Sequence, residues 1–162
     1  MKTALLYSSK YGSTERVAEQ IADKLNPPVD LINLAEQQVQ LTDYDSFIIG
    51  LPVLAENTTL DMRRFLGKNL TEIADKIIAV FILCWNTHKY ETYIEKLFNN
   101  KLSPKCITAC VGGEFNFDKM MDIEKNIVKD ITGIKENSSK ISTEEIDRFV
   151  DNVNKQLVKS NS

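Results

Sequence analysis

A short loop rich in hydroxyl groups is the segment of this sequence that is best suited to bind a ligand. It follows an apolar run at residues 3–7, and its candidate binding residues are Ser9, Lys10, Tyr11, Gly12, Ser13 and Thr14. Ser13 is predicted to cap a helix, and the unpaired backbone N–H groups at a helix N-terminus attract anions. Gly12 can adopt the positive φ angle that a loop wrapped around an anion requires. The loop therefore predicts a site for a phosphate monoester, with an ordinary serine-rich turn as the alternative.

Other phosphate-binding motifs do not fit this chain. A P-loop needs Ser or Thr after its Gly-Lys pair, whereas Gly67-Lys68 precedes an asparagine. A dinucleotide-binding fingerprint needs three spaced glycines after the first strand, and this loop has one. A domain that is phosphorylated on aspartate needs acidic residues at the strand ends, where this chain has Tyr7, Ser8 and Gly50. A hydroxyl-lined site for a phosphate monoester remains.

Short apolar runs alternate with stretches of helical spacing along the chain. Strands are predicted at residues 3–7, 29–33, 46–50, 77–84 and 106–111. These runs are nearly continuous in apolar residues, as strands buried on both faces must be. We therefore expect a single domain, residues 1–162, with a doubly wound α/β fold, in which a five-stranded parallel sheet of order 2-1-3-4-5 has helices on both faces. Ligands bind such sheets beyond the carboxyl ends of the strands, beside the point where the strand order reverses.

The segments between the strands carry helix signals. Thr58 and Asp61 resemble a capping pair that opens a helix running toward Gly67. A helix after the fifth strand is marked by Ile123, Ile127, Val128 and Ile131. The polar residues 134–139 are expected to form a loop.

The loop after the first strand resembles the flavodoxin family. Flavodoxins carry (T/S)-x-T-G-x-T at this point, and residues 9–14 match this motif except that Tyr11 replaces the central threonine. The strand positions, the helix order and the chain length are similar as well. The resemblance implies a protein that binds the phosphate of FMN in this loop and transfers electrons.

Within that family, the sequence is most similar to the branch that contains the flavodoxin-type protoporphyrinogen dehydrogenases. The residues that carry this similarity are Lys10, Gly12, Thr14, Arg16, Gly50, Gly112 and Gly113. It implies an FMN-dependent oxidoreductase that acts on a small molecule such as protoporphyrinogen or a quinone.

If the FMN phosphate occupies the first loop, the flavin ring is expected between the loops that follow the third and fourth strands. The first of these contributes the apolar run Pro52, Val53, Leu54 and Ala55. An apolar run just past a strand end is a surface that a flat ligand covers, although packing against a neighbouring loop is the alternative. The second contributes Cys84, Trp85, Asn86 and Thr87. Trp85 is a candidate to stack on the ring, and a core position for it is nearly as probable.

Composition excludes several other classes of protein. The formal net charge of −3 and the pI of about 5.3 argue against binding nucleic acid through overall charge. The longest apolar run, residues 77–85, is too short to span a membrane. No signal peptide precedes the first strand, so a cytoplasmic location is expected. The alternatives are thus an electron carrier with a redox partner protein, an oxidoreductase with a small-molecule substrate, and a regulatory domain that has lost FMN.

The three cysteines are expected to be free thiols. Together with a single histidine they do not complete a zinc site, so no metal is expected. Cys106 and Cys110 lie four residues apart in one predicted strand, which is too far for a disulfide bond. Buried small side chains are the simplest interpretation of all three.

Overall fold

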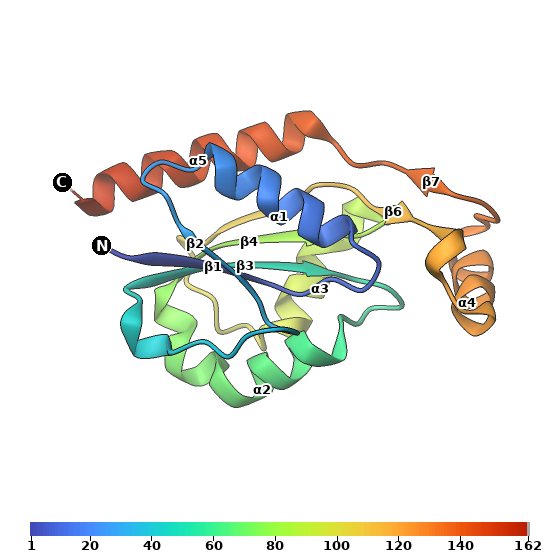
Figure 1. Cartoon of the computed structure of the whole chain (residues 1–162), viewed down its shortest axis with the longest axis horizontal. Coiled ribbons are helices and arrows are strands. Elements are labelled where there is room, and N and C mark those ends of the chain that lie inside the picture. Colours follow the sequence, from blue (N-terminus) through green and yellow to red (C-terminus); the bar gives the residue numbers. More distant parts are fainter. Residues whose placement is uncertain (162) are drawn as a thin grey trace.

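Five parallel strands form the central sheet (Figure 1). The strands are β1 (Thr3–Tyr7), β2 (Asp30–Asn33), β3 (Ser46–Pro52), β4 (Ile77–Leu83) and β5 (Ile107–Cys110). Their order is β2-β1-β3-β4-β5, which confirms the predicted topology. The structure is a computed structural model that describes residues 1–161, so the predicted domain end at residue 162 lies outside the described residues.

Helices cover both faces of this sheet, which explains why β1, β3 and β4 are almost continuously apolar. One face carries α1 (Ser13–Lys24) and α5 (Thr143–Asn161), and the other carries α2 (Leu60–Ile73) and α3 (Tyr90–Leu97) (Figure 1). Short 3₁₀ turns lie at Leu41–Asp43, Ala74–Lys76, Thr87–Lys89 and Phe117–Lys119. Among the helices that the structure describes, none has the length and apolar character needed to cross a bilayer.

The register of β1 and β3 brings their following loops together. Tyr7, the last residue of β1, lies opposite Gly50 of β3. A Cβ atom on Gly50 would lie 2.1 Å from the ring of Phe81, so only glycine lets this ring pack against β3. The chain leaves both strands at the same edge of the sheet, where the sequence predicted the ligand site.

Helix α2 differs from its prediction at both ends. Thr59, rather than Thr58, is the N-cap, and its side chain accepts a hydrogen bond of 3.2 Å from the backbone N–H of Met62. The helix also continues past Gly67 to Ile73, because Leu70 and Ile73 are buried on the sheet while Gly67 faces open space. One glycine costs about 1 kcal/mol in a helix, which two buried apolar side chains more than offset.

An excursion between β5 and α5 extends beyond the carboxyl edge of the sheet. It contains β6 (Glu114–Phe115), α4 (Asp122–Thr132) and β7 (Ser138–Ser139) (Figure 1). The prediction of a polar loop over residues 134–139 was wrong in part, because β7 pairs antiparallel with β6. A small core of Phe117, Met120 and Val128 packs the excursion against the loops after β1 and β3, through Tyr11 and Leu54.

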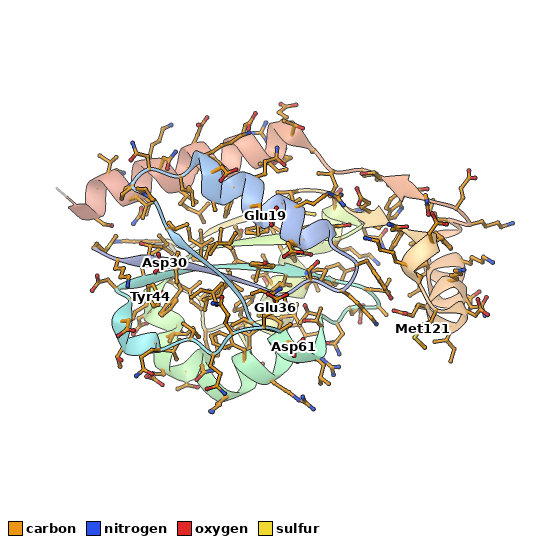
Figure 2. The ribbon with its side chains drawn as sticks, viewed as in Figure 1. Glu19, Asp30, Glu36, Tyr44, Asp61 and Met121 are labelled. Carbon is orange, nitrogen blue, oxygen red and sulfur yellow. The ribbon has the colours of Figure 1, made fainter. Side chains whose placement is uncertain are left out.

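The apolar residues that predicted α4 do not face the main core. Ile123, Ile127 and Ile131 are 69%, 38% and 48% exposed, whereas Val128 is fully buried. Met121, just before the helix, is also exposed and projects from its start (Figure 2). The helix exists as predicted, but it is buried through Val128, which packs on Phe117 and Met120, and not through its isoleucines. The reason is that the excursion lies beside the edge of the sheet and not on one of its faces.

Candidate functional site

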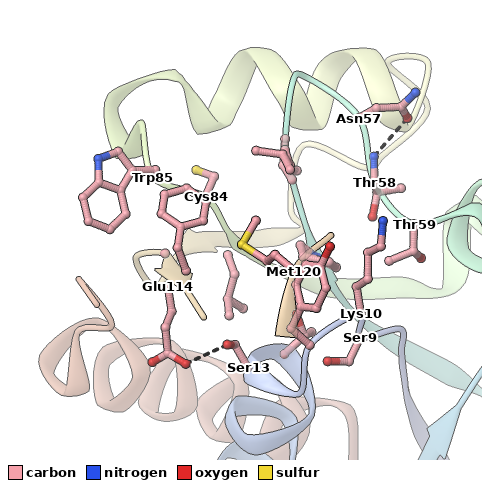
Figure 3. A pocket seen from close by; sticks show the side chains of 18 of the residues that line it. Ser9, Lys10, Ser13, Asn57, Thr58, Thr59, Cys84, Trp85, Glu114 and Met120 are labelled. Atoms are coloured by element: carbon pink, nitrogen blue, oxygen red, sulfur yellow. Dashed lines mark hydrogen bonds between the residues drawn. The ribbon is translucent and has the colours of Figure 1, made fainter. Parts of the chain in front are cut away.

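A cleft of about 450 Å³ opens at the carboxyl edge of the sheet, within the size range of small-molecule sites (Figure 3). Ten of the residues predicted from sequence line it together: Ser9, Lys10, Tyr11, Ser13, Thr14, Pro52, Val53, Leu54, Cys84 and Trp85. They come from the loops after β1, β3 and β4, and the excursion closes the cleft with Glu114, Phe115 and Met120.

The remaining predicted residues lie elsewhere. Gly12 shapes the first loop from within, since it is the N-cap of α1 with a φ angle of 95°. Ala55 and Asn86 line a neighbouring hollow of about 320 Å³ rather than the cleft. Thr87 faces a groove beside β5. Ala55, Asn86 and Thr87 each follow an apolar run, and the sequence did not reveal where the chain turns away from the cleft.

Several lining residues were not predicted as part of the site. Thr58, Thr59 and Arg63 come from the end of the loop after β3 and the first turn of α2. The two successive threonines at the predicted start of this helix are visible in the sequence, where Thr58 indicated only a helix cap. Figure 3 shows Thr58 and Thr59 at one end of the cleft and Trp85 at the other.

Hydrogen bonds tie the polar loops to each other. Thr59 donates a hydrogen bond of 2.6 Å from its hydroxyl to the Ser8 hydroxyl, which links the loops after β3 and β1. Within the first loop, the backbone N–H of Gly12 donates to the Ser9 hydroxyl at 3.0 Å. Because glycine takes the N-cap position, Ser13 does not cap α1 as predicted. Its hydroxyl instead donates to Glu114 at 2.7 Å.

The Glu114 carboxylate collects three donors at the N-terminus of α1. Besides Ser13, it accepts from Arg16 at 2.5 Å and from Ser139 at 3.0 Å. Burial raises the pKa of Glu114, but the hydrogen bonds from Arg16, Ser13 and Ser139 outweigh it and hold this pKa below its ordinary value. The negatively charged Glu114 carboxylate therefore lies at the N-terminus of α1, where the partial positive charge of the helix favours an anion.

A second acidic residue of the excursion faces the same loop. The Lys10 ammonium lies 2.6 Å from Oε2 of the buried Glu124. This oxygen has no well-aligned hydrogen bond within the described residues, so the contact is an ion pair that balances the buried charge. Lys119 of the excursion donates to the backbone carbonyl of Tyr11 at 3.3 Å. Together with the hydrogen bond between Ser13 and Glu114, these two contacts hold the first loop against the excursion.

Two buried hydroxyl groups in the cleft wall have no partner. Within the described residues, neither the Tyr11 hydroxyl nor the Thr58 hydroxyl makes a hydrogen bond. An unpaired buried polar group costs about 1–3 kcal/mol, so such groups mark a place for oxygen atoms of a ligand. The cleft is also lined by the apolar side chains of Val53, Leu54 and Met120. This lining fits a ligand that combines a phosphate with a flat apolar ring.

Trp85 forms a wall of the cleft rather than part of the sheet core. Its ring lies 5.0 Å from that of Phe115 at an interplanar angle of 31°, and Lys140 lies 4.2 Å from its centroid. Its position is thus set by partners on the excursion and on the segment that enters α5.

The loop after β3 contains a tight turn made without glycine. Leu54 and Asn57 form a two-way backbone pair, with N–H to carbonyl distances of 2.9 and 3.1 Å. Between them, Ala55 and Glu56 have φ angles of 53° and 63°. Two successive positive φ angles define a type I′ turn, which favours Asn and Gly. The chain therefore holds this rim of the cleft in a conformation that is unfavourable for its own residues.

The sheet order, together with a hydroxyl-rich loop at the switch point and a cleft at the carboxyl edge, defines a flavodoxin-like α/β protein. The family model described as flavodoxin domain matches residues 4–142. The chain therefore belongs to the flavodoxin domain family. No curated protein matches it.

Solved structures share this fold. Oxidised flavodoxin 1 from Bacillus cereus has a TM-score of 0.55 at 20% identity, with 78% of this chain and 92% of that chain covered. A Fusobacterium nucleatum flavodoxin bound to flavin mononucleotide has a TM-score of 0.53 at 14% identity, with 96% and 99% covered. The Flv1 flavodiiron core from Synechocystis has a TM-score of 0.53 at 21% identity, with 69% and 30% covered.

Proposed function

We propose that this protein binds FMN in the cleft and carries electrons to and from a redox partner protein. The observation that carries the proposal is one cleft at the carboxyl edge of the sheet whose lining combines the unpartnered hydroxyls of Tyr11 and Thr58 with apolar side chains. Membership of the flavodoxin domain family supports it. So does the likeness to a flavodoxin that is bound to flavin mononucleotide.

Each part of the cleft has a task in this proposal. The hydroxyls of Ser9, Tyr11 and Thr58 and the N-terminus of α1 would hold the phosphate. Val53, Leu54, Trp85 and Met120 would exclude water from the flavin ring. When bound, FMN supplies transfer of one or two electrons, and the chain contributes binding, orientation and electrostatics.

Binding of FMN and of riboflavin to the purified protein tests the cofactor assignment. We expect tight binding of FMN, with quenched flavin fluorescence, and much weaker binding of riboflavin because it lacks the phosphate. Thr58→Val should lower FMN affinity about tenfold, since about 1.4 kcal/mol of phosphate hydrogen bonding is lost. Thr71→Val is the matched control, because Thr71 is an exposed residue of α2 that contacts Lys101. A protein that binds neither flavin would contradict the proposal and favour a regulatory domain that has lost FMN.

A second candidate is an FMN-dependent oxidoreductase that acts on a small molecule such as protoporphyrinogen or a quinone. It is favoured by the hollow of about 320 Å³, which shares Val53, Leu54 and Trp85 with the cleft and adds Ile131 and Tyr93. A flat apolar substrate would fit between these side chains. The two candidates are separated by turnover of the FMN-loaded protein with protoporphyrinogen or a quinone, compared with electron transfer to cytochrome c. Turnover would also support membership of the protoporphyrinogen dehydrogenase branch.

We also propose that residues 1–162 fold as one domain located in the cytoplasm. The family match ends at residue 142, just before α5 (Thr143–Asn161), whose Ile146, Phe149 and Val153 belong to the same core cluster as Leu5 of β1. Limited proteolysis should leave one resistant fragment that spans this core. Cell fractionation tests the location.

A further inference from the structure

Two cysteine thiols meet at the carboxyl edge of the sheet. The Sγ atoms of Cys84 and Cys110 lie 3.2 Å apart, although the residues are 26 positions apart in the sequence. Cys110 ends β5 opposite Ile82 of β4, and the backbone N–H of Cys84 donates to the carbonyl of Gly112 at 2.9 Å. All three cysteines are free thiols, and the spacing in the sequence drew attention only to the pair within one strand. The pair on neighbouring strands is the one whose thiols are in contact.

The Cys84–Cys110 pair separates two hollows of the surface. Cys84 lines the cleft of about 450 Å³ described above. Cys110 lines the groove of about 530 Å³ beside β5, together with Lys140, Glu145 and Arg148. Both side chains are largely buried, at 3% and 9% exposure. A small reagent in the groove would therefore meet Cys110 first and would not need to enter the cleft.

The two thiols are electrostatically unequal. The hydrogen bond with Cys84 lowers the pKa of Cys110 below that of an ordinary thiol, against the effects of burial and of the Glu145 charge. The same hydrogen bond, with burial, raises the pKa of Cys84. A thiolate is the nucleophile in thiol–disulfide exchange, and the partner thiol then resolves the mixed disulfide. The pair thus combines an attacking thiolate with a protonated resolving thiol.

We propose that Cys84 and Cys110 form a redox-active dithiol that exchanges with low-molecular-weight disulfides in the groove beside β5. The Cys110 thiolate attacks one sulfur of the disulfide, forms a mixed disulfide and releases the first thiolate. Cys84 then loses its proton and attacks Cys110 Sγ, which forms the Cys84–Cys110 bond and releases the second thiolate. The protein dithiol loses two electrons and two protons, and the small disulfide gains them as two thiols. This activity does not depend on FMN.

Cys106 provides an internal control for the exchange. It is partly buried against the core cluster beneath α2 and α3, and its Sγ donates to the backbone carbonyl of Ile107 at 3.8 Å. Burial raises the pKa of the Cys106 thiol to about 12. At neutral pH we expect Cys110 to react at least about tenfold faster than Cys106, because its thiolate fraction is far larger.

The experiment uses reduced, folded protein without flavin and an excess of hydroxyethyl disulfide, followed by acid quenching, alkylation in denaturant and mass spectrometry. We expect a loss of two hydrogens, one alkylated residue at Cys106 and a peptide that links Cys84 to Cys110. Cys106→Ser should give the same linked peptide. Because the test contains no FMN, its failure leaves the proposed function untouched, and failure of FMN binding leaves the exchange untouched.

The single variants distinguish attack from resolution. Cys84→Ser should trap a mixed disulfide on Cys110, and Cys110→Ser should react at least about tenfold more slowly at the remaining cysteines. Circular dichroism before and after oxidation establishes that each protein stays folded. Three alkylated cysteines in the wild-type protein, a link that includes Cys106, or cross-linked dimers would each overturn the proposal.

Discussion

The hydroxyl oxygen of Ser13 and Oε1 of Glu114 lie 2.7 Å apart, joining the first residue of α1 to the first residue of β6. Residues 101 positions apart therefore meet at the positive end of a helix dipole. The same carboxylate pairs with Arg16. The excursion thus supplies its own anion at the place where we propose that the cofactor phosphate is held.

Glu114→Gln should strengthen FMN binding. The substitution removes a negative charge beside the proposed phosphate site and frees the cation of Arg16, while the amide still accepts from Ser13. A charge at a helix N-terminus is worth about 1 kcal/mol at most in exposed settings, which corresponds to about fivefold in affinity. Titration of the variant with FMN, followed by flavin fluorescence, measures the change.

The matched control for this prediction is Glu144→Gln. It changes the net charge by the same amount, but Glu144 lies in the first turn of α5, outside the lining of the cleft, and is paired with Arg148. Its FMN affinity should equal that of the wild-type protein. Weaker binding by Glu114→Gln would mean that this carboxylate organises the loop rather than competes with the phosphate.

Alkaline pH should destabilise the protein through Tyr7. Burial, followed by the hydrogen bond that Tyr7 donates to Glu15, raises the pKa of this phenol from 10.0 to about 12. A raised pKa means that the folded state favours the neutral phenol. This contribution to stability is therefore complete below pH 10.0 and is lost as the pH rises to about 12. The negative charges of Glu36 and Glu19, both labelled in Figure 2, raise the pKa of Tyr7 further.

Urea unfolding at a series of alkaline pH values measures the Tyr7 contribution. The free energy of unfolding of wild-type protein should fall over this interval, and that of Tyr7→Phe should fall less. Tyr44→Phe should also reduce the fall, because it removes the other phenol whose pKa is raised to about 12, in this case by burial and by Asp30. Equal slopes for the wild-type protein and Tyr7→Phe would contradict the assignment.

The sheet was predictable from sequence because long apolar strands can exist only between two layers of helices. Contacts at the site were less predictable. Ser13 and Gly12 both carry N-terminal signals for α1, and the local sequence does not tell that Gly12 is the N-cap while the Ser13 hydroxyl donates to the distant Glu114. The Cys84–Cys110 contact requires the register of two neighbouring strands, which periodicity does not give. The sequence was thus sufficient to predict which loops carry binding residues, but not the contacts between residues that are far apart in the chain.

Helix α4 shows the same limit and gives a stability prediction. Its isoleucines form a regular apolar stripe, yet Ile123 is 69% exposed while Val128 is fully buried. Ile123→Lys should change the free energy of unfolding by less than about 0.5 kcal/mol. Val128→Ala should cost about 2 kcal/mol, because two buried methyl groups and their packing are lost. Chemical denaturation of both variants measures the difference, and a larger loss in Ile123→Lys would mean that another surface covers the stripe.

The glycine-free turn at the rim of the cleft should be improved by glycine. Glu56 has a φ angle of 63° in the second central position of the turn, where Cβ costs about 1 kcal/mol. Glu56→Gly should therefore raise the free energy of unfolding by less than about 1 kcal/mol, measured by urea denaturation, because relief of strain exceeds the added chain entropy. Ala22→Gly, inside α1, is the control and should lower it by about 1 kcal/mol. A destabilised Glu56→Gly variant would mean that the ion pair between Glu56 and Lys96, at 3.7 Å, holds the turn more strongly than its backbone opposes it.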